Sequence, residues 1–303
     1  MAILAMAIFD TPENGRAELT RRTLESLTDT VDFYKHRLFL VINAATPETM
    51  AAIKTFSAKA VSRVHETPKA GGVGMEAKNP VTVIRNSENV GTARAINQAW
   101  KHKYPGENAI KMDNDVVIHR SGWVDEMEEA ISRDPRIGII GLKRKDLWET
   151  PWHPNPDHRS TLRMLPHEAG QKWLIVEDVN HVMGTCQMYS AALLEKIGYL
   201  YQRGLYGFDD SLAAIRCKVA GFNSCFLQGV EIDHIDPGGN DFTQWKRDKA
   251  GEDSPEYHRL KAGYLNGTIG VYYDADGNNP TTLDTVERSV PRYSWAAPNL
   301  HTR

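Results

Sequence analysis

The chain has 303 residues, of which 41% are hydrophobic and 25% are charged, a balance typical of a globular protein. Its formal net charge of −3 excludes a global basic field that would attract nucleic acid or acidic membranes, although it leaves room for local basic patches. The apolar start at Met1–Phe9 lacks a charged leading segment, which indicates a strand rather than a signal peptide. No stretch reaches the roughly eighteen unbroken apolar residues that a membrane span needs.

The cysteines are Cys186, Cys217 and Cys225, an odd number without paired spacing. They predict reduced core residues in a cytoplasmic protein and argue against a zinc site.

Apolar runs alternate with amphipathic stretches through the first half of the chain. Strand, helix, strand and helix in this order predict an α/β fold with a mostly parallel central sheet flanked by helices. The expected strands are Ile3–Phe9, Leu38–Ile42, Val81–Ile84, Ala109–Met112 and Ile137–Leu142, and the expected helices are Ala17–Thr28, Thr46–Ala60, Asn89–Lys103 and Gly122–Arg133.

Polar side chains follow the ends of these strands, where ligands bind in parallel sheets. The strongest group is Asp113-Asn114-Asp115, since side chains two residues apart in extended chain share a face. Two carboxylates on one side suit a divalent cation that also holds phosphate and water. Ordinary turn chemistry also selects Asp and Asn, so the pattern needs support from elsewhere.

The second half of the chain is less regular. Lys143–Lys172 mixes basic residues, tryptophans and prolines, which fits either a wall that binds an acceptor or a pinned surface loop. The Gly-rich stretch at Pro68–Pro80 favours a flexible excursion over a phosphate loop. Further strands are expected at Trp173–Val176, Val182–Tyr189 and Ser224–Leu227, and helices at Ala191–Ile197, before Gly221 and at Pro255–Leu265.

Several motifs in series resemble those of the GT-A glycosyltransferases, most closely the inverting family 2, over roughly residues 1–240. Asn89-Val90-Gly91 with Arg94 is similar to the segment that precedes the metal motif, and Asp113-Asn114-Asp115 is similar to the D-x-D motif itself. The remaining matches are Gly184–Gly198, Asp209-Asp210 followed by Arg216 and Ala220-Gly221-Phe222, and His234.

The resemblance implies a GT-A, Rossmann-like catalytic domain over residues 1–240, with a nucleotide-sugar half (1–119) and an acceptor half (120–240). Residues 241–303 would be an irregular C-terminal extension packed on that domain. The implied reaction moves a sugar from a nucleotide-diphosphate sugar, with a UDP-sugar expected, to an acceptor hydroxyl with inversion.

The resemblance also implies roles for single residues. Asp210 would be the general base, and Asp209 would cap its helix or bind the acceptor. Asp113, Asp115 and His234 would hold Mn²⁺ or Mg²⁺, which neutralises the leaving diphosphate. The donor nucleotide would contact Asp10, Thr11, Asn43, Asn89, Gly91, Arg94, Asp113 and Asn114.

One departure from the family weakens the expectation of uracil. Family members often carry an acidic residue at the end of the second strand, where this chain has Ile42-Asn43-Ala44. Three alternatives stay open: transfer to a hydroxymethylated base in nucleic acid, a non-catalytic protein that binds nucleotide sugars, and a nucleotidyltransferase. The basic segment at Lys143–Lys172 favours the first of these.

Overall fold

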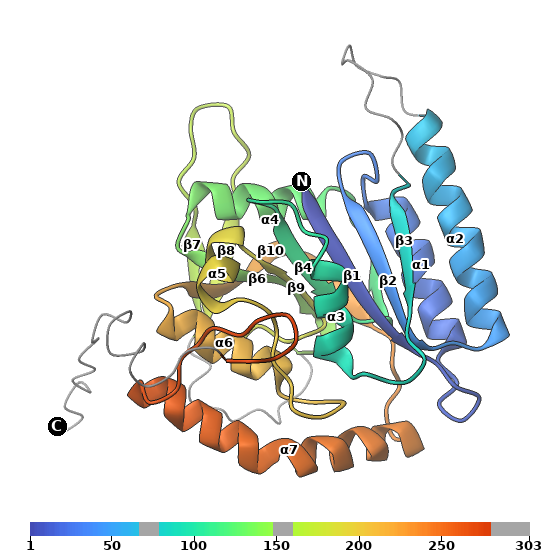
Figure 1. Ribbon diagram of the computed structural model, residues 1–303. Helices are drawn as coiled ribbons and strands as arrows, with labels where there is room; N and C mark the ends of the chain where they lie inside the picture. The colour runs from blue at the N-terminus through green and yellow to red at the C-terminus, as the bar shows by residue number, and fades with distance from the viewer. Residues whose placement is uncertain (67–78, 148–159, 280–303) are drawn as a thin grey trace, which may run out of the picture.

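One twisted sheet runs through the part of the chain that the computed structural model describes, residues 1–66, 79–147 and 160–279 (Figure 1). The order of the strands is β3-β2-β1-β4-β9-β6-β10-β8-β7, and β5 pairs with β10. β1 to β4 pair in parallel, as do β6 and β10, whereas β5, β7, β8 and β9 pair antiparallel with their neighbours. The strands are β1 (Ala2–Phe9), β2 (Arg37–Ala44), β3 (Val81–Arg85), β4 (Asn108–Met112), β5 (Val116–Ile118), β6 (Ile137–Arg144), β7 (Thr161–Met164), β8 (Ile175–Val179), β9 (Cys186–Tyr189) and β10 (Asn223–His234).

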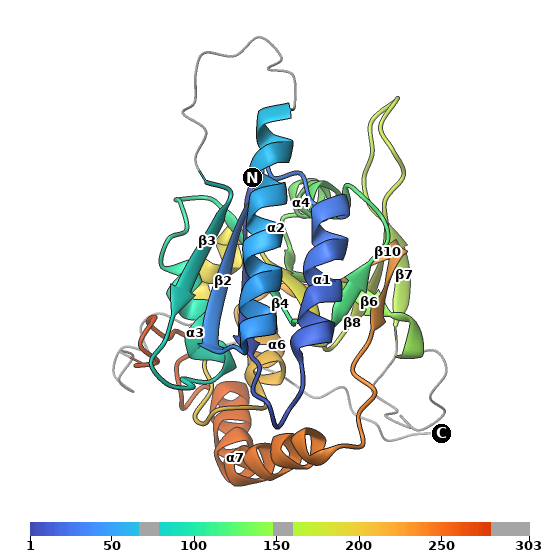
Figure 2. The same cartoon turned by 90° about the vertical axis from the view of Figure 1, so that its right-hand side faces the viewer.

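Helices cover both faces of the sheet (Figure 2). Residues 2 to 6 of β1 are fully buried, and alternate side chains join the apolar clusters on opposite faces, as expected for a central strand of a parallel sheet. One face carries α1 (Ala17–Thr30), α2 (Pro47–Glu66) and α4 (Trp123–Arg133), and the other carries α3 (Thr92–Trp100), α5 (Ala191–Ile197) and α6 (Asp209–Val219). The prediction of an α/β fold with a largely parallel central sheet is confirmed.

Several predicted boundaries in the second half are wrong. The strands expected at Trp173–Val176 and Val182–Tyr189 are β8, which begins at Ile175, and β9, which begins at Cys186. The expected short strand Ser224–Leu227 is only the beginning of β10, which continues to His234 past an irregularity at Gly229. This glycine has a φ of +79°, a value typical of a bulge, and its sequence signal is that of a break. Part of Lys143–Lys172 is regular, since it holds the 3₁₀ turn η1 (Lys145–Leu147) and β7, while its residues 148–159, like 67–78, lie outside the described residues.

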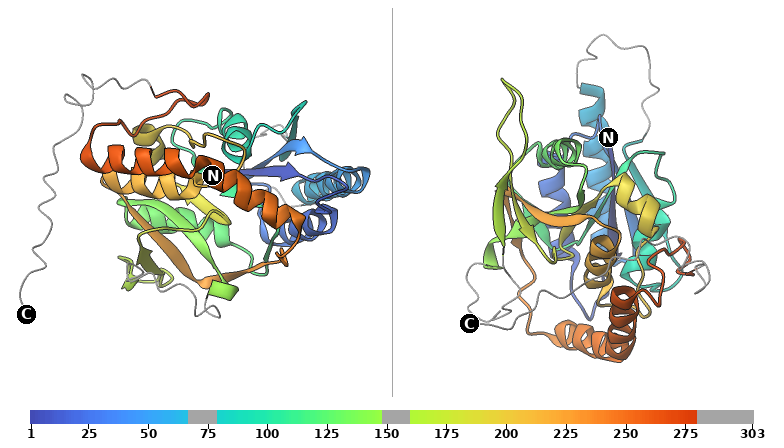
Figure 3. Two further views of the ribbon diagram at one scale, coloured as in Figure 1. Left: turned by 90° about the horizontal axis from the view of Figure 1, so that it is seen from below. Right: turned by 90° about the vertical axis from the view of Figure 1, so that its left-hand side faces the viewer.

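The C-terminal region contains a longer helix than predicted. α7 spans Asp241–Asn266, with Pro255 inside it rather than at its start. Asn240 caps the helix, because its Oδ1 accepts a hydrogen bond from the N–H of Thr243 (2.9 Å). The helix lies across the end of the sheet where β1 terminates (Figures 1 and 3). Leu260 and Tyr264 of α7 are buried against α6, so this part of the extension packs on the domain.

The three cysteines are buried and unpaired, as predicted. In the described part of the chain, no helix combines the length and the apolar character that crossing a bilayer requires.

Candidate active site

A cavity of about 380 Å³ opens at the carboxyl ends of β1, β2 and β4, beneath the first half of α7. It brings together side chains that are far apart in the sequence, with four acidic and four basic residues in its wall. Its acidic, basic and imidazole side chains are Arg16, Lys111, Asp113, Asp115, Arg144, Asp209, Asp210, His234 and Lys246.

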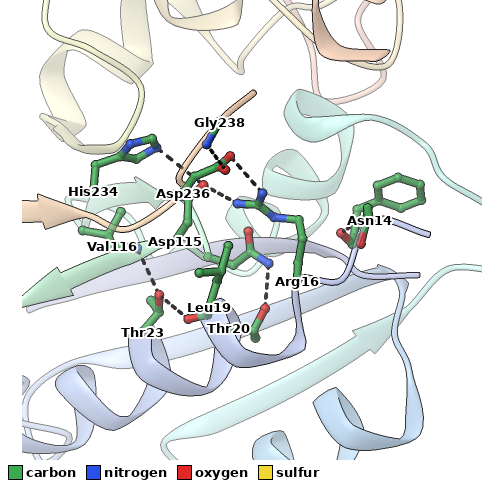
Figure 4. A network of polar contacts seen from close by, with 12 residues as sticks. Asn14, Arg16, Leu19, Thr20, Thr23, Asp115, Val116, His234, Asp236 and Gly238 are labelled. Atoms are coloured by element: carbon green, nitrogen blue, oxygen red, sulfur yellow. Dashed lines mark hydrogen bonds and ion pairs between the residues drawn. The ribbon is translucent and has the colours of Figure 1, made fainter. Parts of the chain in front are cut away.

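Asp115 is the most deeply placed carboxylate of the D-x-D motif. Its Oδ2 accepts a hydrogen bond from the guanidinium of Arg16 and lies 3.6 Å from Nε2 of His234 (Figure 4). Its Oδ1 is buried and has no hydrogen-bond partner among the described residues. Burial by itself would raise the pKa of Asp115, but His234 and Arg16 outweigh burial and lower it. The residue is therefore a buried carboxylate with an oxygen available to a ligand.

Asp113 lies in the same wall, in a setting that disfavours its negative charge. Burial is the main cause, and the carboxylates of Asp115 and Asp209 add to it, so that its pKa rises to about 7 despite Lys111. A divalent cation bound nearby would stabilise the negative charge of Asp113. The unpaired Oδ1 of Asp115, the carboxylate of Asp113 and the imidazole of His234 thus have the chemistry of a site for Mn²⁺ or Mg²⁺.

These three residues do not stand as close together as the ligands of a preformed site. Among the described residues, the group whose ligand atoms all lie within 4.8 Å of one another is His36, Asp125 and Glu128, none of which lines the cavity. The amide of Ala2 donates to Nδ1 of His36, so a neutral His36 carries its proton on Nε2, facing Asp125. That arrangement satisfies the imidazole without an ion.

Asp209 and Asp210 begin α6 at the opposite wall. Asp209 does not cap its helix; its Oδ2 instead forms a buried ion pair with Nζ of Lys111 (2.6 Å). Of the two alternatives predicted for Asp209, helix capping is therefore not observed. A Cβ on Gly184 would lie 2.6 Å from this Nζ, so glycine leaves the room that Lys111 needs.

Asp210 is held by two backbone amides, lies beside His181 and remains part of the cavity wall. The amide of Gly184 donates to its Oδ2 (2.9 Å), the amide of Ser211 donates to its Oδ1 (2.7 Å), and Nε2 of His181 lies 3.3 Å from Oδ2. Burial would raise the pKa of Asp210, but His181 and Lys111 outweigh it and hold the pKa far below its usual range. The side chain is therefore ionised at neutral pH.

The backbone that presents these two carboxylates is strained. Phe208 has a φ of 62°, the left-handed region that side chains other than glycine rarely adopt. Its ring stacks on Tyr257 of α7, with centroids 4.4 Å apart. The extension thus supports the turn that aims Asp209 and Asp210 into the cavity.

The residues expected to bind the nucleotide divide into two groups. Asn43, Asn89, Asp113 and Asn114 line the cavity, and Asn43 also accepts a hydrogen bond from Asn86 (2.9 Å). The other four do not line it.

Each of these four has a structural setting of its own. The carboxylate of Asp10 accepts hydrogen bonds from Arg16, Thr46 and Thr49, and Thr11 closes a local turn with Asn14. Gly91 begins α3, and Arg94 is exposed on that helix.

Arg16, Lys111, His181 and Lys246 line or support the site, yet the sequence reasoning singled out none of them. Single basic residues in a strand, a turn and a helix carry no motif. A lysine inside an otherwise apolar strand, as at Lys111, is the one signal that could have been noticed, because a buried lysine requires a partner.

The comparisons with known proteins identify the family and the fold. The family model described as "Glycosyl transferase family 2" matches residues 13–198. The chain therefore belongs to glycosyl transferase family 2, and its fold is that of a GT-A glycosyltransferase.

Two solved structures illustrate the likeness. A mannosyltransferase from Pyrobaculum calidifontis, PcManGT, in complex with GDP-Man and Mn²⁺, is 15% identical, with a TM-score of 0.51 over 87% of this chain and 69% of that one. S. aureus TarS 1-349, in complex with UDP-GlcNAc, is 14% identical, with a TM-score of 0.50 over 88% of this chain and 72% of that one. At such identities the likeness concerns the fold. A search of curated protein sequences finds no match.

Proposed function

We propose that this protein transfers a sugar, with inversion, from a nucleotide-diphosphate sugar to an acceptor hydroxyl, in a reaction that depends on a divalent cation. The observation that carries the proposal is the convergence of Asp113, Asp115 and His234 with the Asp209-Asp210 pair on one cavity. The neighbours in complex with GDP-Man, UDP-GlcNAc and Mn²⁺ support a nucleotide-sugar donor and a metal. In this arrangement the nucleotide occupies the 1–119 half and the acceptor the 120–240 half.

Asp210 is the base in this proposal. Its carboxylate is ionised at neutral pH and fixed by the amides of Gly184 and Ser211, so it can accept the proton of an acceptor hydroxyl as that oxygen attacks the anomeric carbon. A base with a low pKa acts here by position more than by basicity. Attack from the face opposite the departing diphosphate inverts the anomeric centre.

Asp113, Asp115 and His234 would hold the cation. When bound, it supplies Lewis-acid neutralisation of the diphosphate. Lys111 keeps Asp209 paired, and its own pKa is held well above the usual value because the nearby carboxylates outweigh the effect of burial. The base and the metal carboxylates are thus separated by a buried cation that limits their mutual repulsion.

The first experiment identifies the donor nucleotide. UDP, GDP and their sugars are compared in a thermal-shift panel, each with Mn²⁺ and with EDTA. We expect one of the two nucleotides to raise the melting temperature more than the other. We expect a UDP-sugar, although Asn43 replaces the acidic residue frequent in the family. Proton NMR of the product's anomeric linkage then distinguishes inversion from retention.

The base is tested by Asp210→Asn. We expect kcat to fall by about 10²- to 10⁴-fold, the usual contribution of a general base, with donor affinity retained. Asp276→Asn is the matched control, since Asp276 is exposed and pairs only with Lys101 among the described residues. Near-wild-type transfer by Asp210→Asn would remove the assignment of the base.

The cation is tested separately. EDTA should abolish transfer by the wild-type protein, and Mn²⁺ should restore it. Asp115→Asn should not respond to Mn²⁺, because it replaces the carboxylate whose Oδ1 has no hydrogen-bond partner in the described part of the chain. Full activity in EDTA would contradict the dependence on a metal.

A further inference from the structure

Two cations stand beside the D-x-D carboxylates, and they come from opposite ends of the chain. Arg16 precedes α1, and Lys246 lies in α7, outside the span of residues 13–198 that matches the family. Both lie over the ring of Phe242, with Cζ of Arg16 5.1 Å and Nζ of Lys246 4.9 Å from its centroid. Contact with an aromatic face stabilises such charges.

The two cations share one counter-ion. Oδ2 of Asp236 accepts hydrogen bonds from Nη1 of Arg16 (2.9 Å) and from Nζ of Lys246 (2.8 Å). Figure 4 shows the Arg16 side of this network, with the amide of Gly238 donating to the other oxygen of Asp236 (3.0 Å). The carboxylate of Asp236 therefore forms ion pairs with both Arg16 and Lys246.

Asp236 and the two cations differ in whether they reach the cavity. Asp236 is 5% exposed and does not line the cavity, whereas both cations do. The carboxylate thus sits behind Arg16 and Lys246 and holds them at the wall. Arg16 is further engaged by Asp115, which leaves Lys246, with 19% of its side chain exposed, as the more accessible of the two.

We propose that Arg16 and Lys246, positioned by Asp236, form a clamp that binds the diphosphate of the donor nucleotide even without a bound metal. The inference rests on the proposed function, because it assigns the anion to the same cavity. Cations fixed at a partly enclosed wall make charge-assisted hydrogen bonds with phosphate oxygens, and a carboxylate behind them reduces the cost of burying two positive charges. α7 is then part of the donor site rather than only a cover.

The competing interpretation is that the Arg16–Asp236–Lys246 network only fastens α7 to the start of α1. A fastener contributes to stability, whereas a clamp contributes to affinity for diphosphate. Lys246 distinguishes the two, since Arg16 is 4% exposed and its removal would leave buried carboxylates unpaired.

The experiment measures binding of UDP and GDP by isothermal titration calorimetry in EDTA at low salt, with uridine and guanosine as probes that lack the diphosphate. For the nucleotide that the wild-type protein binds, Lys246→Met should weaken affinity about tenfold, the usual effect of losing one charge-assisted hydrogen bond. Lys246→Arg should restore most of it. Lys249→Met, on the same helix with Glu252 as its partner, should bind like the wild type, and no variant should alter nucleoside binding.

The outcomes separate this inference from the proposed function. If Lys246→Met keeps wild-type affinity in EDTA, or if neither nucleotide binds the wild-type protein without metal, the clamp is wrong even where sugar transfer is observed. If affinity depends on Lys246 as described but no sugar is transferred, the clamp stands and the assignment of the reaction falls. Circular dichroism and melting curves show whether Lys246→Met is folded, and Lys246→Arg tests the charge in a variant that keeps the ion pair.

Discussion

Asp113 lies close to the carboxylates of Asp115 and Asp209, and in the metal-free protein this has a measurable consequence. Its pKa is about 7 in the folded chain, chiefly because of burial, against an ordinary value of 3.8. Between these two pH values the folded state binds a proton that the unfolded state releases. The contribution of this group to stability is therefore present at low pH and is lost as the pH rises through 7.

Asp113→Asn should for this reason stabilise the metal-free protein at high pH. An amide resembles the protonated carboxyl, so the two proteins should be equally stable near pH 4. Above pH 7 the variant should have the larger free energy of unfolding, by on the order of 2–4 kcal/mol. Urea denaturation in EDTA from pH 4 to pH 8.5 measures this, with Asp276→Asn as the control. A variant that is less stable than the wild type at pH 8 would show that the charge of Asp113 is not strained.

Single residues also show how far the sequence could predict the site. Asp113 and Asp115 are predicted because a carboxylate motif follows a recognisable strand, whereas the Asp209-Asp210 pair is predicted from the resemblance to the family, and all four line the cavity. Asp10 also follows a predicted strand, yet its carboxylate already accepts hydrogen bonds from Arg16, Thr46 and Thr49 and does not line the cavity. A strand end places a side chain near the site, but only packing decides which way it faces.

Among the helices, Gly91 and Gly251 stand in opposite settings: the backbone requires glycine at the first position but not at the second. Gly91 begins α3 with a φ of +85°, and a Cβ there would lie 2.9 Å from the carbonyl oxygen of Gly204. Gly251 lies inside α7 with a negative φ and open space around the position of a Cβ.

Opposite effects of alanine are expected at these two positions. Gly91→Ala should lower the free energy of unfolding by about 1–3 kcal/mol, through strain in the left-handed region and contact with backbone that cannot move aside. Gly251→Ala should raise it by about 0.5–1 kcal/mol, since alanine favours a helix more than glycine does. Thermal or chemical denaturation of the pair provides the comparison. Equal effects of the two substitutions would contradict the role given to Gly91.

The elements explain which parts of the fold were predictable. β1, β2 and β4 are recognisable as apolar runs because both of their faces are buried, whereas β3 is an edge strand with several exposed residues. The helices beside them are recognisable because each buries one face. α7 is largely polar, and its predicted start at Pro255 is wrong because proline is usual in a first turn. Its true start depends on the Asn240 cap, and its buried residues face α6, a partner that no local pattern announces.

In the molecule as a whole, Arg216 of α6 joins the segment after α7 to the backbone around the end of α5. The side chain is fully buried, and it donates hydrogen bonds to the carbonyls of Ile197, Tyr199 and Val271. The segment after α7 also pairs with the backbone around Gly198, through hydrogen bonds between Tyr273 and residues 197 and 199. One guanidinium thus serves carbonyls on both sides of this junction.

Because the junction is buried and shared, α7 and the GT-A domain should unfold together. Differential scanning calorimetry of the wild-type protein should show one transition whose calorimetric and van't Hoff enthalpies agree. Arg216→Met should lower the free energy of unfolding by about 3–5 kcal/mol, since three carbonyls lose their donors at once. Arg216→Lys should restore little, because an ammonium lacks the planar fork that reaches several acceptors.

The same variants connect stability to catalysis. α7 supplies Lys246 to the cavity and Tyr257 to the strained turn before Asp209, so loosening the junction should disturb both walls of the site. Below its melting temperature, Arg216→Met should therefore show a raised KM for the donor together with a lowered kcat. Separate melting transitions in the wild-type protein, or a variant with wild-type kinetics, would instead make α7 an independent attachment whose contribution to the site is incidental.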